Sequence, residues 1–362
     1  MSARKYWLGF STVNGVGPMR VRALLERFGD LERAWKAPED ALRAAGLDRR
    51  AIANLQRARH TLNLDALEAQ LDALGAHAIT LQDPHYPALL REIADAPPVL
   101  YVKGRLQAGD RWAVAFVGTR RATVYGREMT RRLVEALAST GITVISGLAL
   151  GIDAVAHRAA LEAGGRTIAV LGCGIDRVYP PEHRKLAAAI TQHGALVTEF
   201  PPGTPPEAKN FPVRNRLISG LSLGVVVVEA PKRSGALLTA NVAADQGRDV
   251  FAVPGNATSA SSTGANRLIQ NGAKLVLDAQ DILDELNLDY TAVETRTRVH
   301  ALVPDDPIQA QIAALLSDTP IHIDELYRLS GLPVAQVSST LVVMELKGLV
   351  LRHEGMYYTL AH

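Results

Sequence analysis

The feature that most constrains this chain is a regular alternation of short apolar runs and amphipathic stretches between residues 66 and 287. Several runs are apolar throughout, as expected for strands that helices cover on both faces. Strands alternating with helices predict right-handed crossovers and a doubly wound, mostly parallel α/β sheet. The first two runs precede the regular alternation, so we expect them to extend the sheet. In chain order the runs read AITL, VLYVKG, WAVAFVG, TVISG, TIAVLG, ALVTEF, GVVVVEA, DVFAVPG and AKLVLD.

The segment before residue 66 is predicted to be helical. In NGVGPMRVRALLERFG, a Gly-Val-Gly-Pro turn precedes apolar residues at helical spacing, namely Val21, Leu24, Leu25 and Phe28. The turn at 15–17 is typical of helix-hairpin-helix or SAM-like modules, in which glycine exposes backbone N–H groups to a DNA phosphate. A capped turn that joins two packed helices explains the same residues, and both interpretations stay open.

The end of the chain follows a winged-helix order of three helices and a hairpin. DPIQAQIAALLSD is amphipathic, two more helices flank Gly-Leu-Pro, and LVLRHEGMYYTL predicts a hairpin that turns at Glu354-Gly355. Winged-helix domains often place the second of these two helices in a DNA groove. Here that helix, 334–348, carries one basic residue, Lys347, which favours protein contact or weak DNA contact over sequence-specific readout.

A chain of 362 residues exceeds one ordinary domain. We predict a helical module at 1–65, the α/β domain at 66–287, a linker at 288–303 and the winged helix at 304–362. The formal net charge is only +2, so binding of nucleic acid requires a local basic patch.

The sequence also bears on the compartment. Cys173 is the single cysteine, so no disulfide forms within the chain and a reducing cytoplasm is expected. The first residues, MSARKYWLGFSTVNG, lack the apolar core and cleavage site of a signal peptide. No apolar run is long enough to span a bilayer. We therefore expect a cytoplasmic protein that does not act at a membrane.

The loops after the predicted strands define the expected ligand crevice, because the carboxyl ends of parallel strands meet at one edge of a sheet. The loop after WAVAFV begins with Gly118, Thr119, Arg120 and Arg121. A mononucleotide phosphate fits the first two residues at a helix N-terminus, and the arginines suit a polyanion equally well. Neither a G-x-G-x-x-G fingerprint nor a Walker A sequence is present.

A later loop places basic residues around an aromatic ring. Lys209, Phe211 and Arg214 lie together in KNFPVRNR. This combination is typical of single-strand binding, where cations follow the backbone and a base stacks on the ring at about 1–3 kcal/mol. The alternative is that Arg214 and Arg216 brace the loop by pairing with carboxylates such as Glu199 or Glu229. We expect bracing for Arg216, and both interpretations stay open for the other three residues.

Signatures of catalysis are weak. No G-x-S-x-G elbow is present. Asp153 and His157 lie four apart on one predicted helix, and we interpret them as a helix-start carboxylate and a hydrogen-bonded core histidine. Cys173 is expected to be a buried thiol. The histidines form no H-E-x-x-H motif or Cys/His cluster, so we predict no catalytic residue, no metal site and no cofactor.

Eight stretches follow one another between Val114 and Val276: VGTRRATVYG, SGLALGIDAVAH, GCGIDRVYPPEH, TEFPPG, FPVRNRLISGLS, EAPKRSGALLTA, GRDVFAVPG and GANRLIQNGAKLV. Together and in this order they resemble the DNA processing protein A family, also called DprA or Smf. The helical N-terminal segment and the winged helix resemble the flanks of some members. Leu150 stands where many members carry a basic residue, His183 where Asn is common, and Thr198 where Ser is common.

The resemblance implies an extended Rossmann-like domain that binds single-stranded DNA without nucleotide chemistry and forms a homodimer. It implies protection of incoming single strands and loading of RecA on them during natural transformation, past single-strand-binding protein. Arg120 matches a family DNA contact in the Gly-Ser/Thr-Arg turn, and the region around FPVRNR lines the family's pocket. The predicted single-stranded-DNA site comprises Gly118, Thr119, Arg120, Arg121, Gly147, Lys209, Asn210, Phe211, Arg214 and Asn215.

Two other functions compete with this prediction. A Rossmann-fold enzyme of the phosphoribohydrolase type would use Gly118, Glu199 and Glu229, but its P-G-G-x-G-T-x-x-E motif is missing from the sequence. A transcription regulator would read DNA through its winged helix, but basic residues are scarce on the helix concerned. Single-strand binding explains the arginines and phenylalanine of FPVRNR best.

Overall fold

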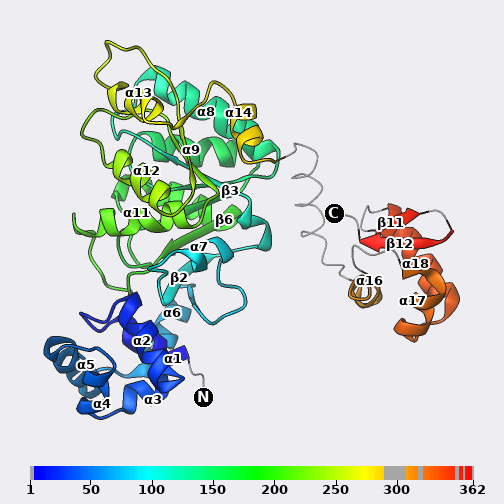
Figure 1. Cartoon of the computed structure of the whole chain (residues 1–362), viewed down its shortest axis with the longest axis horizontal. Coiled ribbons are helices and arrows are strands. Elements are labelled where there is room, and N and C mark those ends of the chain that lie inside the picture. The colour runs from blue at the N-terminus through cyan, green and yellow to red at the C-terminus, as the bar shows by residue number, and fades with distance from the viewer. Residues whose placement is uncertain (1–3, 289–305, 317–320, 347–349, 354, 361–362) are drawn as a thin grey trace. The chain divides into compact units, whose positions relative to one another are not determined.

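The computed structural model describes residues 4–288, 306–316, 321–346, 350–353 and 355–360 (Figure 1). The chain divides into two compact units, Met1–Asn287 and Leu288–His362. The predicted linker is almost wholly outside the described residues. Within the described residues, no helix combines the length and the apolar character needed to cross a membrane.

A single nine-stranded sheet forms the centre of the first unit, in the order β1-β2-β6-β5-β4-β3-β7-β8-β9. Every pair from β6 to β9 is parallel, whereas β1 and β2 are antiparallel additions at one edge. The α/β prediction and the added first two strands are therefore confirmed. The strands are β1 His77–Thr80, β2 Val99–Gly104, β3 Ala113–Val117, β4 Thr143–Ser146, β5 Thr167–Val170, β6 Gly194–Thr198, β7 Gly224–Val227, β8 Asp249–Ala252 and β9 Lys274–Leu275.

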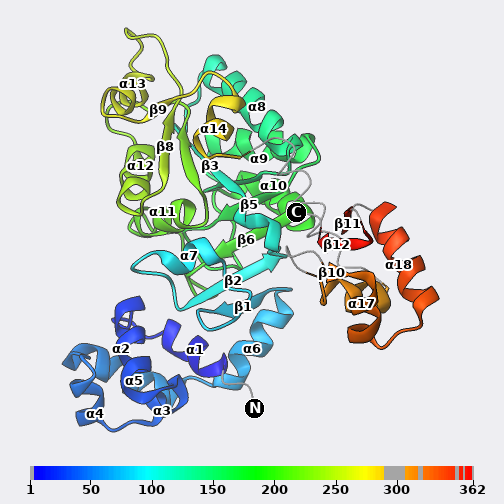
Figure 2. The ribbon, with the colours of Figure 1, turned by 45° about the vertical axis from the view of Figure 1, so that its right-hand side comes forward.

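Helices cover both faces of this sheet (Figure 2). Ala113, Ala115 and Val117 of β3 pack in one core with Leu217 and Ala240, which lie on two helices of the same face. The residues between them on β3 are also fully buried, which explains why this run is apolar throughout. The helices of this unit beyond β1 are α7 Ala88–Glu92, α8 Val124–Ser139, α9 Ile152–Glu162, α10 Arg184–His193, α11 Asn210–Gly220, α12 Gly235–Asp245, α13 Thr263–Gln270 and α14 Ala279–Glu285, with short 3-10 turns η1 Ala108–Arg111 and η2 Pro181–His183.

The N-terminal helices share a core with the sheet. Phe10 and Trp35 meet edge to face at 5.1 Å, and their cluster continues to Leu171 and Leu196 beside the strands. The predicted boundary at residue 65 falls in the first turn of α6, and the division there stays a prediction. The helices are α1 Arg4–Ser11, α2 Pro18–Phe28, α3 Leu31–Lys36, α4 Glu39–Ala44, α5 Arg49–Thr61 and α6 Leu64–Ala73.

The glycine turn before α2 has its carbonyl group occupied within the chain. Gly15 has a φ of +91°, a conformation that favours glycine. Its carbonyl oxygen accepts from Arg20, which also pairs with Asp48 at 2.6 Å. The structure thus joins the turn to α5 through one arginine. Whether the turn also binds a phosphate stays a prediction.

The second unit is a winged helix, as predicted. Three helices pack around Leu326, Val337 and Leu341, and an antiparallel sheet in the order β10-β12-β11 completes the fold. Lys347 and Glu354 lie outside the described residues. The elements are α16 Pro307–Ala313, β10 Ile321–His322, α17 Ile323–Ser330, α18 Val334–Leu346, β11 Val350–His353 and β12 Tyr357–Leu360.

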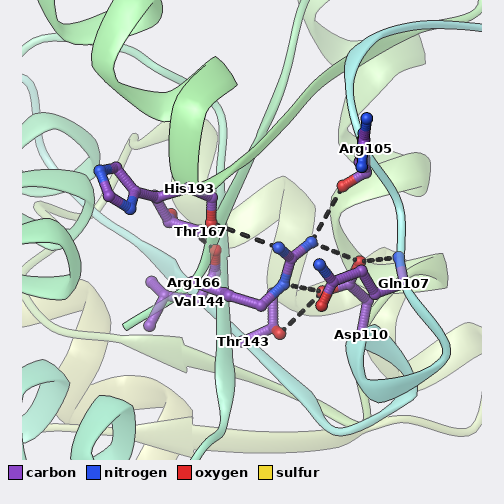
Figure 3. Close-up of polar contacts among 8 residues, drawn as sticks. All are labelled: Arg105, Gln107, Asp110, Thr143, Val144, Arg166, Thr167 and His193. Carbon is purple, nitrogen blue, oxygen red and sulfur yellow. Dashed lines mark hydrogen bonds and ion pairs between the residues drawn. The ribbon is translucent and has the colours of Figure 1, made fainter. Parts of the chain in front are cut away.

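A polar cluster joins the amino ends of the parallel strands of the first unit (Figure 3). Arg166, just before β5, donates to both carboxylate oxygens of Asp110 at 2.9 and 3.0 Å and to the carbonyl oxygen of Arg105 at 2.9 Å. Thr143, which opens β4, donates its hydroxyl to the same carboxylate at 2.9 Å. This cluster fixes where β4 and β5 begin, at the end of the sheet opposite the loops that follow these two strands.

Candidate nucleic-acid interface

Phe211 occupies the centre of the predicted site. It lies in the first turn of α11, and its ring centroid is 5.8 Å from the guanidinium carbon of Arg120 and 5.9 Å from that of Arg214. The ring also presses on the backbone of Gly172, where an added Cβ would lie 2.8 Å from Phe211 Cδ1. Loops after β3 and β5 therefore converge on one aromatic ring, although they are far apart in the sequence.

The loop after β3 presents two exposed cations on a fixed backbone. The Thr119 amide donates to the carbonyl oxygen of Glu229 at 2.7 Å, and its own carbonyl oxygen accepts from Ile152 at 3.2 Å. At Gly118, a Cβ would lie 2.4 Å from Ile152 Cγ1, so the loop lies directly against α9. Arg120 and Arg121 are exposed, and neither forms an ion pair with a carboxylate of the described residues. Both are therefore available to a polyanion.

For Arg214 the sequence left ligand contact and bracing both open, and the structure gives it buried, bracing contacts. Arg214 is only 5% exposed. Its Nη1 donates to the carbonyl oxygen of Gly147 at 2.8 Å and to that of Val170. Arg214 lies one turn after Phe211 on the same side of α11, so the helix carries it below the ring and into the protein. It braces the ends of β4 and β5 and lies beside the ring of Phe211.

A nearby carboxylate, that of Asp153, offsets part of the cost of burying the Arg214 guanidinium. Burial lowers the pKa of Arg214 to about 10, and the nearby carboxylate of Asp153 acts in the opposite direction. Asp153 accepts hydrogen bonds from the amides of Gly147 at 3.0 Å and Ala149 at 3.3 Å. An added Cβ at Gly147 would lie 2.6 Å from Arg214 Nη2. Gly147 is itself buried, so it accommodates the guanidinium instead of facing solvent.

The remaining predicted residues lie around the start of α11. Lys209 is exposed and pairs with Glu207 at 2.6 Å. Asn210 is buried and donates its amide to the carbonyl oxygen of Pro205 at 3.2 Å. The side chain of Asn215 accepts from Arg214 Nε at 3.2 Å. Lys209 therefore presents a charge to solvent, whereas the two asparagines have contacts that shape the loop.

The bracing role expected for Arg216 is confirmed. Its guanidinium pairs with Glu199 and lies 3.3 Å from Asp95. Burial raises the pKa of Glu199 to about 7, and Arg216 opposes this shift. Arg216 also donates to the carbonyl oxygen of Asp95 at 2.6 Å, in the segment before β2.

Asp153 lies in the first turn of α9, as interpreted from the sequence. His157 is a core histidine that is hydrogen-bonded at Nδ1 only, because its buried Nε2 has no partner within the described residues. His157 Nδ1 lies 2.6 Å from Thr167 Oγ1 in the core, and burial lowers its pKa to about 3. Cys173 is buried, as expected, and burial raises its pKa to about 11. Within the described residues, no group of three or more His, Cys, Asp or Glu side chains is placed to hold a metal ion.

The sequence analysis did not select Tyr179, which the structure places beside Phe211. The two ring centroids are 5.6 Å apart. The available signal was an aromatic residue two positions after Arg177, in a loop that begins with glycine at a strand end. An aromatic residue of one loop can be paired with a ring of another loop only when the strand order is known.

Two family descriptions match this chain. Residues 77–287 match DNA recombination-mediator protein A, and residues 296–356 match the DprA winged helix domain. Protein Smf of Synechocystis is 38% identical over 392 residues, which cover 99% of this chain and 98% of that relative. DNA processing protein DprA of Bacillus subtilis is 42% identical over 221 residues, which cover 60% of this chain and 74% of the relative.

Two solved structures are also similar. DNA processing protein A from Streptococcus pneumoniae superposes with a TM-score of 0.67 at 35% identity, over 78% of this chain and 97% of that one. The protein from Helicobacter pylori, whose structure addresses its single-stranded DNA binding mode, superposes with a TM-score of 0.52 at 30% identity, over 58% and 96% of the two chains.

Proposed function

Because this chain belongs to the DNA recombination-mediator protein A family, we propose that it binds single-stranded DNA at the loops around Phe211 and acts as a recombination mediator without enzymatic activity. The observation that carries the proposal is the Phe211 ring, which lies between an exposed arginine and a buried one. A base can stack on such a ring while exposed cations hold the flanking phosphates. The Helicobacter pylori relative, with its described single-stranded DNA binding mode, supports the proposed class of ligand.

The proposed division of work follows from exposure. Arg120, Arg121 and Lys209 contact phosphates, because their charges face solvent. Phe211 supplies the stacking face. Gly118 and Thr119 hold the loop against α9, while Gly147, Asn210, Arg214 and Asn215 keep the floor of the site in shape. Phosphate contacts and stacking carry little base information, so sequence preference is slight and arises only from how strongly the bases of the strand stack on one another.

The direct test is a fluorescence anisotropy titration with labelled oligo(dT), as a single strand and as a duplex with oligo(dA). It is run at two salt concentrations without nucleotide or metal. We expect tight binding of the single strand that weakens steeply with salt, because each neutralised phosphate releases counterions. Equal affinity for the two forms, or no binding, would remove the proposed function.

We further propose that the protein loads RecA on incoming strands during natural transformation, in place of single-strand-binding protein. The description of the matching family, DNA recombination-mediator protein A, supports this proposal. A suitable assay measures DNA-dependent ATP hydrolysis by RecA on oligonucleotides coated with single-strand-binding protein. Addition of this protein should shorten the lag before hydrolysis. An unchanged lag at saturating protein would contradict RecA loading but would leave strand binding intact.

The alternative of a nucleotide-processing enzyme has less support. Glu199 is engaged by Arg216. Both carboxylate oxygens of Glu229 accept hydrogen bonds from Thr123, from its amide and its hydroxyl, each at 2.9 Å. One observation favours a small ligand, namely a cavity of about 460 Å³ lined by Thr123, Tyr125 and Glu229 among others. Thermal stabilisation or hydrolysis of added nucleotides, together with absent strand binding, would favour this alternative.

A further inference from the structure

We propose that Tyr179 and Phe211 form a two-ring platform on which two successive bases of the strand lie. The inference rests on the proposed function and specifies it, because it adds a second stacking residue to the site. It also specifies the shape of the bound strand. Tyr179 lies between β5 and η2, in the loop that begins with Gly172.

The first support is the exposure of the Tyr179 ring. It is 40% exposed, although it lies at the rim of a well-packed site. Its hydroxyl group makes no hydrogen bond within the described residues. By contrast, the hydroxyl groups of the buried tyrosines Tyr86 and Tyr101 lie 2.8 Å from Pro97 O and 2.6 Å from Ser11 Oγ, respectively. Buried tyrosines usually find such a partner for the hydroxyl group. Tyr179 has none within the described residues, so its ring is not held in the core and part of it stays accessible to a ligand.

The second support is the geometry of the two rings. Their centroids are 5.6 Å apart and their planes meet at 44°. Successive nucleotides of a stacked strand are separated by about 3.4 Å along the axis, which is too close for one base on each ring. Bases lying on the two rings are therefore tilted and separated from one another. The platform selects an extended strand whose bases stack on protein and not on each other.

The third support is the charge around the rings. Arg120 approaches Phe211 from the loop after β3. Arg177 precedes Tyr179 by two residues, and its side chain is about half exposed while its Nε lies 3.5 Å from Asp176. One cation therefore lies beside the Phe211 ring, and another lies two residues before Tyr179 in the same loop. A strand that crosses both rings passes both cations, so the phosphates next to each stacked base find a positive charge.

The matched variants are Tyr179→Leu and Tyr179→Phe, because the first keeps apolar bulk without an aromatic face and the second keeps the ring. For Tyr179→Leu, binding of oligo(dT) should weaken by about 5- to 150-fold, the range expected for one lost base stack. The dependence of affinity on salt should stay unchanged, since no phosphate contact is removed. Tyr179→Phe should bind like the unchanged protein. The thermal midpoint of each variant controls for folding.

A second measurement uses the unchanged protein and so does not depend on how a variant folds. Oligo(dT) carrying 5-iodouracil at single positions is cross-linked by light, and the modified peptides are identified by mass spectrometry. Cross-links to Tyr179 and Phe211 from neighbouring nucleotides support the platform. Oligo(dA), whose bases stack strongly on one another, should bind more weakly than oligo(dT), because it must first be unstacked.

The outcomes separate the two proposals. If the unchanged protein binds the strand and Tyr179→Leu binds it with equal affinity, the platform is overturned and the proposed function stands. The same holds if the strand cross-links to Phe211 and not to Tyr179. Equal affinity for oligo(dA) and oligo(dT) also counts against an extended strand. Absent binding by the unchanged protein overturns both.

Discussion

One turn of α11 separates Phe211 from Arg214, and this spacing gives the two residues different roles. Phe211 lies at the mouth of the site with part of its ring accessible. Arg214 lies below the ring and holds the carbonyl oxygens of Gly147 and Val170. One residue therefore contacts the ligand, and the other keeps the two loops in place for it. The two roles predict different consequences of substitution.

Removing Arg120 and Phe211 together should weaken binding and leave the fold intact. Loss of the ring alone costs about 1–3 kcal/mol of binding free energy. Loss of the arginine should lower the slope of log K against log salt by about 0.7, the value for one phosphate of a single strand. The double variant Arg120→Ala/Phe211→Ala is measured by anisotropy at several salt concentrations. Arg131→Ala, on the exposed surface of α8, is the matched control. Unchanged affinity in the double variant would remove this site assignment.

Replacing Arg214 should instead destabilise the fold. Arg214→Ala removes the hydrogen-bond donor of two carbonyl oxygens. It also removes the positive charge that lies near the buried carboxylate of Asp153. Leaving a buried carboxylate without its compensating positive charge costs about 3–5 kcal/mol of the free energy of unfolding. Urea unfolding of the first unit measures the loss, with Arg120→Ala as the exposed arginine control. An Arg214→Ala protein of normal stability that binds DNA weakly would assign Arg214 to the ligand.

At the scale of elements, α11 carries the site on its first turn and the core on its last turns. Pro212 falls in the first turn, where a backbone N–H needs no partner within the helix. Leu217 and Ile218 are buried against the sheet. The amino ends of the strands are held separately by the contacts of Arg166 with Asp110. Ligand loops and strand anchors thus lie at opposite ends of the same sheet.

Removing Arg166 should therefore loosen the sheet without altering the ligand loops. Arg166→Ala breaks the paired hydrogen bonds to Asp110, while Thr143 and the amide of Gln107 still donate to that carboxylate. We expect a loss of about 1–3 kcal/mol in the free energy of unfolding. Hydrogen exchange should increase in β4 and β5, and affinity for single-stranded DNA should stay the same. Equal losses of stability and affinity would indicate that the two ends are coupled.

Strand positions were the most predictable part of the fold, and the contacts between loops were the least. Each of the apolar runs named from the sequence contains most of a strand, because burial on both faces leaves a pattern along the chain itself. The inward direction of Arg214 was not predictable, because the sequence of FPVRNR does not indicate whether Arg214 and Arg216 face solvent or the core. Tyr179 was missed because nothing in its own loop indicates which ring lies beside it.

At the scale of the whole molecule, β9 is the last strand of the sheet, and no other strand of the described residues pairs with its outer edge. Leu275 and Leu277, at and just after this strand, are 39% and 59% exposed. An unpaired edge with apolar side chains is a template for pairing with another strand. A second copy of this chain, related by a twofold axis, offers the same edge, so we propose that the expected homodimer forms here.

The double variant Leu275→Glu/Leu277→Glu should convert a dimer into a monomer, because like charges would meet across the twofold axis. Multi-angle light scattering after size-exclusion chromatography measures the mass in solution. Leu238→Glu, on the exposed surface of α12, is a control that should stay dimeric. A monomeric unchanged protein would contradict the homodimer, and a dimeric double variant would place its interface elsewhere.

The sequence by itself determined the α/β class, the strand runs, the winged helix and the family. These properties depend on patterns between neighbouring residues and on motifs that keep their order along the chain. Only the tertiary structure decided that Arg214 braces two strand ends, that Arg216 pairs with Glu199, and that Tyr179 meets Phe211. The physical reason is that the order of strands in the sheet differs from their order in the chain. Contacts between loops follow the spatial order, which brings distant residues together at one edge.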